Sequence, residues 1–144
     1  MRIKFKRVRD MQFVTTGGQP FKTTTVGFWA WSEPKNKGTL LIQCAAMTSC
    51  CHELAVFGHE CIEALYCWLR GITTEDCDKF DAFYEAEYEA GRIPKTQEAG
   101  HDPRCCYHWG HMAGVVWEYV CIYGTFGSWK AYGDDCNRIM GIEA

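Results

Sequence analysis

Ten cysteines in a chain of 144 residues constrain what this sequence can fold into more than any other feature. Such a content is typical of a disulfide-linked scaffold, a structural zinc module, or a domain that packs free thiols as small apolar side chains. No C-x-x-C motif occurs, and the two adjacent pairs, Cys50–Cys51 and Cys105–Cys106, are poor chelators because neighbouring side chains diverge. We therefore expect free, mostly buried thiols, with disulfides or a cysteine-bound metal as the less favoured alternatives.

The amino-terminal residues MRIKFKRVRD alternate apolar and basic side chains and contain no apolar segment of the kind found in secretory signal peptides. No segment reaches the roughly 18 consecutive apolar residues of a transmembrane helix. Because thiols stay reduced in the cytoplasm, we expect a cytoplasmic protein that does not contact a membrane.

The length suits a single domain over residues 1–144, and 47% hydrophobic residues are enough for one sizeable core. The formal net charge of −3 argues against a protein that binds nucleic acid through its phosphates. The basic residues between Lys4 and Arg9 are more simply explained as the solvent face of a strand. Aromatic side chains are expected to fill the core, among them Trp29, Trp31, Trp68, Trp109 and Trp117.

Hydrophobic patterning predicts an α+β fold, in which a small N-terminal antiparallel sheet of about three strands precedes three or more helices. The loop 33–38 contains Pro, Asn and Gly between two apolar runs, which is typical of a β-hairpin. Residues 15–20 are typical of a turn-rich loop. The strands are expected at residues 2–9, 24–31 and 39–43.

Apolar residues at helical spacing predict three longer helices and one or two short ones. Thr48 or Ser49 is expected to cap the first helix, and Gly71 to end it. A polar loop, residues 91–104, separates the second helix from the third. The expected ranges are 49–70, 74–90, 105–123 and, for the short helices, 126–140.

The first predicted helix carries the residues that most clearly suggest chemistry. His59 and Glu63 lie one turn apart on one stripe, so both can reach a single metal ion, as the two histidines of H-E-x-x-H do. Glu60 lies beside them, where the general base of a helix-borne metal hydrolase is found. His52 lies two turns earlier on the same stripe.

The third predicted helix supplies Tyr107, His108 and His111, with Glu118 two turns further on. His111 would complete a set of two histidines and one carboxylate with open coordination positions, which suits Zn²⁺ or Fe²⁺. A metal there would activate a water molecule, Glu60 would transfer its proton, and Tyr107 or His108 would stabilise the oxyanion. The pattern predicts a metal-dependent hydrolase whose ligands are His59, Glu63 and His111.

The same residues also have simpler explanations. Glu60 and Glu63 fit a solvated helix face, and His111 fits a histidine at the edge of the core that bonds to backbone. His52 and His101 are expected on the surface or in a loop. The combined pattern favours the metal interpretation, because Glu63 is surrounded by apolar residues, where an isolated carboxylate is rarely buried without a partner.

Two segments that contain these residues, GHECIEALYCWLRGITTEDCDKFDAFYEA (58–86) and HDPRCCYHWGHMAGVVWE (101–118), resemble a family of small uncharacterised phage and prophage proteins. The resemblance implies a zincin-like metal-binding protein of a bacterial host's cytoplasm, with strands followed by an H-E helix. Glu63 stands where zincins carry a second histidine, so peptidase activity does not follow from the resemblance. The family pattern falls on His59, Glu60, Glu63, Asp81, Asp102, Tyr107 and His111.

Two other functions fit the sequence. The pairs Glu60-x-x-Glu63 and Asp78-x-x-Asp81 resemble the signature of Mg²⁺-dependent nucleotide pyrophosphohydrolases of the MazG type, which are all-α and would leave the histidines unused. The other is a non-enzymatic phage accessory protein that binds a host protein through aromatic side chains. The expected cofactor is zinc, with iron or magnesium as alternatives.

Overall fold

Strands β2 (Gly27–Glu33) and β3 (Lys37–Ala45) form the expected hairpin. Lys35 and Asn36 in its turn have φ angles of 58° and 55°, the pair of positive angles that a tight type I′ turn needs. The Asn36 side chain donates a hydrogen bond of 2.6 Å to the Ile72 carbonyl, which fastens this turn to the helical part of the chain. The computed structural model describes three parts of the chain: residues 1–9, 25–94 and 97–142.

Strand β1 (Arg2–Val8) lies beside β3 and runs parallel to it, so the sheet is mixed and has the order β1-β3-β2. The predicted antiparallel sheet is therefore wrong for β1. Alternating apolar and basic residues locate a strand but not its direction, because either direction buries the same face. The order places β3, whose Leu40 and Ile42 are fully buried, in the middle, and leaves the lysine-bearing β1 at an edge. The loop predicted at 15–20 lies outside the described residues.

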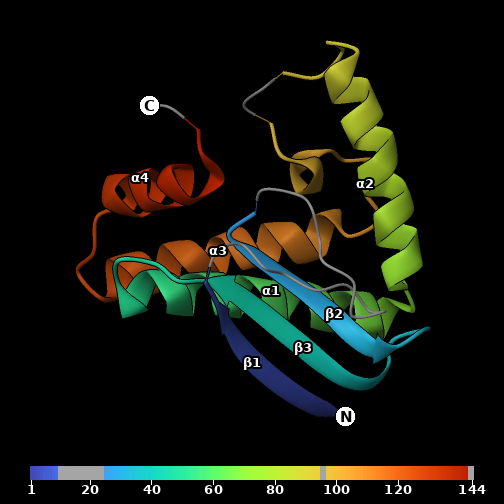
Figure 1. Ribbon diagram of the computed structural model, residues 1–144, viewed down its shortest axis with the longest axis horizontal. Coiled ribbons are helices and arrows are strands. Elements are labelled where there is room, and N and C mark those ends of the chain that lie inside the picture. Colours follow the sequence, from blue (N-terminus) through green and yellow to red (C-terminus); the bar gives the residue numbers. More distant parts are fainter. Residues whose placement is uncertain (10–24, 95–96, 143–144) are drawn as a thin grey trace.

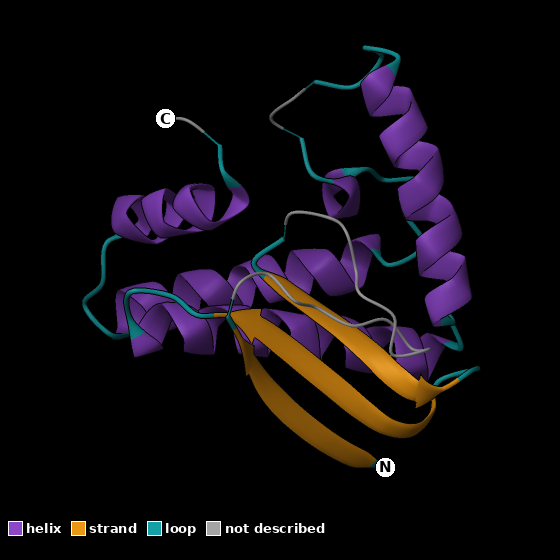
Figure 2. Cartoon of the chain, viewed as in Figure 1, coloured by secondary structure: helices purple, strands orange, loops and turns teal. Residues whose placement is uncertain are grey.

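Helices follow the sheet, which confirms the α+β class (Figure 2). In Figure 1, α1 and α3 lie side by side along the sheet, α2 stands across one end of this pair, and α4 lies near the other end. Helices α1 and α3 make the most extensive helix–helix contact among the described residues. The elements are α1 (Cys50–Arg70), α2 (Thr74–Glu89), the short 3₁₀ helix η1 (Ala99–His101), α3 (His108–Gly124) and α4 (Trp129–Met140).

Helix α1 begins and ends where the sequence predicts. The Ser49 side chain caps it and accepts a hydrogen bond of 3.2 Å from the Cys51 N–H. Gly71 ends it with a φ of 69°, and the following Ile72 N–H donates to the Cys67 carbonyl at 2.9 Å. Helices α2 and α4 also fall within their predicted ranges.

Helix α3 begins at His108 rather than at the predicted Cys105. A turn built around Asp102 precedes it: the Asp102 carbonyl accepts a hydrogen bond from the Cys105 N–H, and its carboxylate accepts one from the Arg104 N–H, both of 2.9 Å. Such an aspartate turn competes with helix formation, which explains the later start.

The structure confirms that the thiols are free, but five of the ten rather than most of them are buried, and only part of the prediction for aromatic residues is confirmed. All ten cysteines are free, and burial raises the pKa of the Cys105 thiol to about 12, so this group stays protonated. Trp29 and Trp31 are buried, whereas Trp68 and Trp109 are 45% and 70% exposed and do not fill the core.

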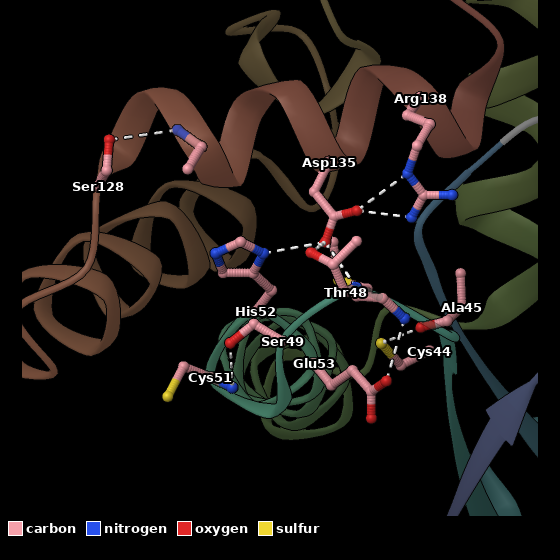
Figure 3. A network of polar contacts seen from close by, with 12 residues as sticks. Cys44, Ala45, Thr48, Ser49, Cys51, His52, Glu53, Ser128, Asp135 and Arg138 are labelled. Atoms are coloured by element: carbon pink, nitrogen blue, oxygen red, sulfur yellow. Dashed lines mark hydrogen bonds and ion pairs between the residues drawn. The ribbon is translucent and has the colours of Figure 1, made fainter.

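Asp135 on α4 ties that helix to the start of α1 (Figure 3). Its carboxylate accepts hydrogen bonds of 3.0 and 2.8 Å from the backbone N–H and the hydroxyl of Thr48, and one of 2.6 Å from Arg138. It also pairs with Nδ1 of His52 at 2.9 Å. His52 is buried by this contact, so its predicted place on the surface is wrong.

Replacement of Asp135 by Ala should lower the free energy of unfolding by about 2–3 kcal/mol, because Thr48 and His52 lose their buried partner. The neighbouring Asp134 is exposed and pairs with Lys130 at the surface, so Asp134→Ala should change this free energy by less than about 0.5 kcal/mol. Urea denaturation at pH 7, followed by circular dichroism, measures both variants, and equal losses would contradict the role of Asp135.

The contacts of Asp135 also predict how the stability of the fold depends on pH. Burial opposes ionisation of Asp135, but the hydrogen bonds from His52, Arg138 and Thr48 outweigh it and hold the pKa of this carboxyl well below its usual range. A depressed carboxyl pKa stabilises the fold above the unfolded value near 3.9 and loses this effect as the pH falls through the folded value. The stability difference between the wild type and Asp135→Ala should therefore shrink as the medium is acidified below about pH 4.

Candidate metal centre

Three donor atoms from α1 and α3 converge on one point. The Nε2 atom of His59 lies 3.1 Å from Nδ1 of His111 and 3.6 Å from Oε2 of Glu63. The Glu63 oxygen and the His111 nitrogen lie 3.2 Å apart. All three side chains are buried, and they are the three residues that the sequence predicts as metal ligands.

The helices explain this convergence. His59 and Glu63 are four residues apart, so both project from the same face of α1, the face that packs against the sheet and α3. His111 stands in the first turn of α3, where its N–H donates to the Tyr107 carbonyl at 2.9 Å. The predicted alternative of a solvated face is wrong for Glu63, which is only 9% exposed.

The triangle formed by these atoms has the dimensions of a metal site. Ligands about 2.0–2.1 Å from a tetrahedral zinc ion are about 3.3 Å from one another. The observed edges, 3.1, 3.2 and 3.6 Å, bracket that separation. Each corner is a nitrogen or oxygen that can accept a proton or bind a cation. Such atoms cannot be buried facing one another unless a proton or a cation lies between them.

Each of the three donor residues has a further carboxylate or an indole as a neighbour. The Nδ1 atom of His59 pairs with Glu118 at 2.7 Å, and the Trp29 N–H donates to the second oxygen of Glu63 at 2.9 Å. The Glu98 carboxylate lies 3.6 Å from Nε2 of His111, a buried nitrogen that has no hydrogen-bond partner among the described residues. Partners of this kind fix the tautomer and orientation of metal-binding histidines.

The sequence does not identify all of these supporting residues. Glu118 follows His111 by seven residues, which places both on one face of α3, and this spacing is the signal that would have assigned its role. Trp29 lies on β2 and Glu98 precedes η1, so no local spacing relates either of them to the ligands.

Hydrogen bonds decide the protonation of the centre. Burial alone would raise the pKa of Glu63, but hydrogen bonds from His111 and His59 outweigh it and lower this pKa to about 2. Burial also disfavours protonated His59, yet the hydrogen bonds to Glu118 and Glu63 raise its pKa well above the usual value. The centre therefore attracts positive charge, which a proton supplies and a divalent cation would replace.

Two glycines leave the space that the histidine rings occupy. A Cβ atom on Gly114 would lie 2.7 Å from the His59 ring, and one on Gly100 would lie 2.2 Å from the His111 ring. Both distances are shorter than carbon atoms tolerate, so any side chain at these positions displaces a ligand.

Glu60 lies on the wall of a cavity of about 730 Å³ that also contains the three donors. Gly27 makes room for it, since a Cβ atom there would lie 2.4 Å from the Glu60 carboxylate. Burial, followed by repulsion from Glu63, raises the pKa of Glu60 to about 8. A carboxyl whose pKa is raised holds a proton more readily, which suits a group that takes a proton from water.

Tyr107, Asp78 and Asp81 line the same cavity. The Tyr107 hydroxyl donates a hydrogen bond to Asp81. Burial raises the pKa of Asp81 to about 6 despite this bond, and burial also raises the pKa of Tyr107. The structure therefore brings these three residues to the wall of the candidate site.

The other predicted residues have different places. His108 pairs through Nδ1 with the Gly100 carbonyl at 2.9 Å and so holds the segment that covers His111, but it is not among the described residues that line the cavity. Asp102 accepts a hydrogen bond of 2.6 Å from Arg104 outside the cavity. His101, by contrast, does line the cavity; it is exposed, and its ring centre lies 4.8 Å from that of His111.

Comparison with known proteins identifies no relative: no family model, curated protein or solved structure matches this chain. Among the described residues, no helix is both long and apolar enough to cross a membrane. A function can therefore be proposed only from the geometry of the centre.

Gly114→Ala should weaken binding of Zn²⁺ by about 10- to 100-fold, because the new methyl group displaces the His59 ring from its partners. Gly133 on α4 faces open space, so Gly133→Ala is the matched control and should leave affinity unchanged. Titration with Zn²⁺ in an isothermal calorimeter measures both. Unchanged affinity in Gly114→Ala would show that the position of His59 does not matter for zinc.

Proposed function

We propose that the protein binds one Zn²⁺ ion, or alternatively Fe²⁺, through His59, Glu63 and His111 and acts as a metal-dependent hydrolase. The observation that carries this proposal is the triangle of three buried donor atoms with edges of 3.1, 3.2 and 3.6 Å. Two nitrogens and one carboxylate oxygen are a ligand set that zinc and iron accept and that leaves coordination positions open.

The residues around the proposed metal ion have separate roles in the proposed hydrolysis. A bound zinc ion would lower the pKa of water to about 7, which makes a nucleophile available at neutral pH. Glu60 accepts the proton of that water and delivers it to the leaving group, while Glu118 keeps His59 in the tautomer that binds through Nε2. We assign to Tyr107 the stabilisation of negative charge on the substrate oxygen, which requires its hydroxyl to turn away from Asp81.

His111→Ala should abolish zinc binding, because it removes one of three ligands. The comparison variant is His101→Ala, which removes an imidazole of a second group of possible ligands, Glu98, His101 and His111, and should retain about one zinc ion per chain because the ion is proposed to lie in the triangle. Inductively coupled plasma mass spectrometry after dialysis against zinc measures the content. If His111→Ala retains the zinc content of the wild type, the ligand assignment is wrong.

Glu60→Gln should separate binding from catalysis. The variant should retain one zinc ion per chain and lose about 10²–10⁴-fold in the rate of hydrolysis, because the amide cannot accept the proton of water. The assay is cleavage of a pool of internally quenched peptides by the zinc-loaded protein. Undiminished cleavage by Glu60→Gln would exclude Glu60 as the general base.

A magnesium-dependent pyrophosphohydrolase is the second candidate. The observation in its favour is that Asp78 and Asp81 line the same cavity as Glu60 and Glu63. Magnesium prefers oxygen ligands, however, and the tightest cluster contains two imidazole nitrogens. We therefore rank the zinc or iron hydrolase first.

The third candidate is a phage accessory protein that binds a host protein. Trp109 is 70% exposed and Val116 and Val120 on the same helix are also exposed, which gives α3 an apolar outer face. Exposed aromatic residues suit protein interfaces. This role is compatible with a metal centre, and the ten free thiols suit a reducing compartment such as a bacterial cytoplasm.

A further inference from the structure

The described wall of the cavity is rich in carboxylates. Among the described residues that line it there is no lysine and no arginine, and the only groups that can become positive are histidines. Seven carboxylates face it: Glu60, Glu63, Asp78, Asp81, Glu85, Glu98 and Glu118. A single divalent ion would neutralise only part of this charge, so the rest of the cavity attracts cations and repels phosphates.

Three of the carboxylates form a row on α2. Asp78, Asp81 and Glu85 are spaced by three and four residues, which places them on one face of the helix, and that face lines the cavity. Asp81 already accepts the Tyr107 hydroxyl. Asp78 and Glu85 form no hydrogen bond or ion pair with any residue in the described parts of the chain, and both are exposed to the solvent that a ligand would replace.

Aromatic side chains accompany this row. Tyr84 and Tyr88 on α2, Tyr119 on α3 and Trp129 on α4 also line the cavity. The rings of Tyr119 and Trp129 stack with centres 3.9 Å apart. Aromatic faces beside carboxylates suit lysine and arginine, whose alkyl stems pack on rings while their charged ends reach acidic groups.

The spacing along α2 indicates a peptide. Asp78 and Glu85 are separated by about 10 Å along the helix axis, at 1.5 Å per residue. A peptide in the polyproline II conformation advances about 3.1 Å per residue and completes a turn every three residues, so side chains three residues apart lie on one side of it, about 9 Å apart, which is close to this separation. A peptide also contains the amide bond that the proposed centre would cleave.

We propose that the substrate is a basic peptide whose lysine or arginine side chains, three residues apart, bind Asp78 and Glu85 while a neighbouring amide bond lies at the metal centre. This inference rests on the proposed hydrolase function. The oxygen of water forms a bond to the amide carbon, the C–N bond breaks, and the proton that Glu60 removes from water goes to the departing amine. The second proton of the water passes from the new carboxyl group to the amine, so the products are a carboxylate and a protonated amine, and no further reactant is needed.

The test uses two fluorescein-labelled twelve-residue peptides that differ only at two positions three residues apart, which hold Lys in one and Glu in the other. Fluorescence anisotropy of the zinc-loaded full chain should show at least about tenfold tighter binding of the Lys peptide, and this preference should weaken as salt is added. ATP, as a phosphate probe, should not compete with the Lys peptide.

The double variant Asp78→Asn/Glu85→Gln should lose about tenfold in affinity for the Lys peptide. Its control, Glu75→Gln/Glu89→Gln, makes the same change in net charge on the same helix at residues that do not line the cavity, and should stay within about twofold of the wild type. Equal losses in both double variants, or equal binding of both peptides, would overturn the inference.

Zinc content, measured on the same samples, separates this inference from the proposed function. A wild type that binds one zinc ion but does not prefer the Lys peptide retains the metal centre and refutes the basic substrate. A wild type that binds neither zinc nor iron refutes the proposed function itself, whichever peptide it prefers.

Discussion

The close approach of α1 and α3 is the constraint on which the rest of the structure depends. Gly58 on α1 accommodates the indole of Trp117 from α3, and Gly114 on α3 accommodates the ring of His59 from α1. Each glycine removes the side chain that would hold the helices apart, so each helix inserts a large ring into its neighbour. Only at this separation do His111 and Glu63 come within 3.2 Å of each other.

This packing has an electrostatic cost that the surrounding residues reduce. A buried carboxylate next to two imidazoles is costly unless its remaining lone pairs are satisfied, and the Trp29 indole satisfies one of them. Glu118 does the same for His59. The protein thus stabilises a polar cluster in its interior where a leucine and two phenylalanines would pack with less penalty, which is the arrangement that the proposed metal site requires.

How much of the fold and of the candidate site can be predicted from the sequence depends on how far apart in the sequence the interacting residues lie. The ends of α1 follow from Ser49 and Gly71, and the ligand pair His59 and Glu63 follows from a spacing of one helical turn, because both depend on local geometry. The assignment of His111 as a proposed ligand was also predictable, because it follows Tyr107 and His108 in a local motif. The direction of β1, the burial of His52 against Asp135 and the contact of Trp29 with Glu63 depend on tertiary contacts that no local pattern encodes.

The charge of the cavity and the chemistry of its centre support each other. The carboxylates around His59 and His111 raise the local attraction for any cation, so they favour metal binding even where they do not touch the ion. The same field opposes an anionic substrate, whose approach would need Asp78 and Glu85 to be neutralised first. A phosphate-cleaving enzyme would gain from lysine or arginine at these positions, and the described lining offers neither. The charge that would favour a metal ion at the proposed centre would therefore also oppose nucleotides and favour positively charged ligands.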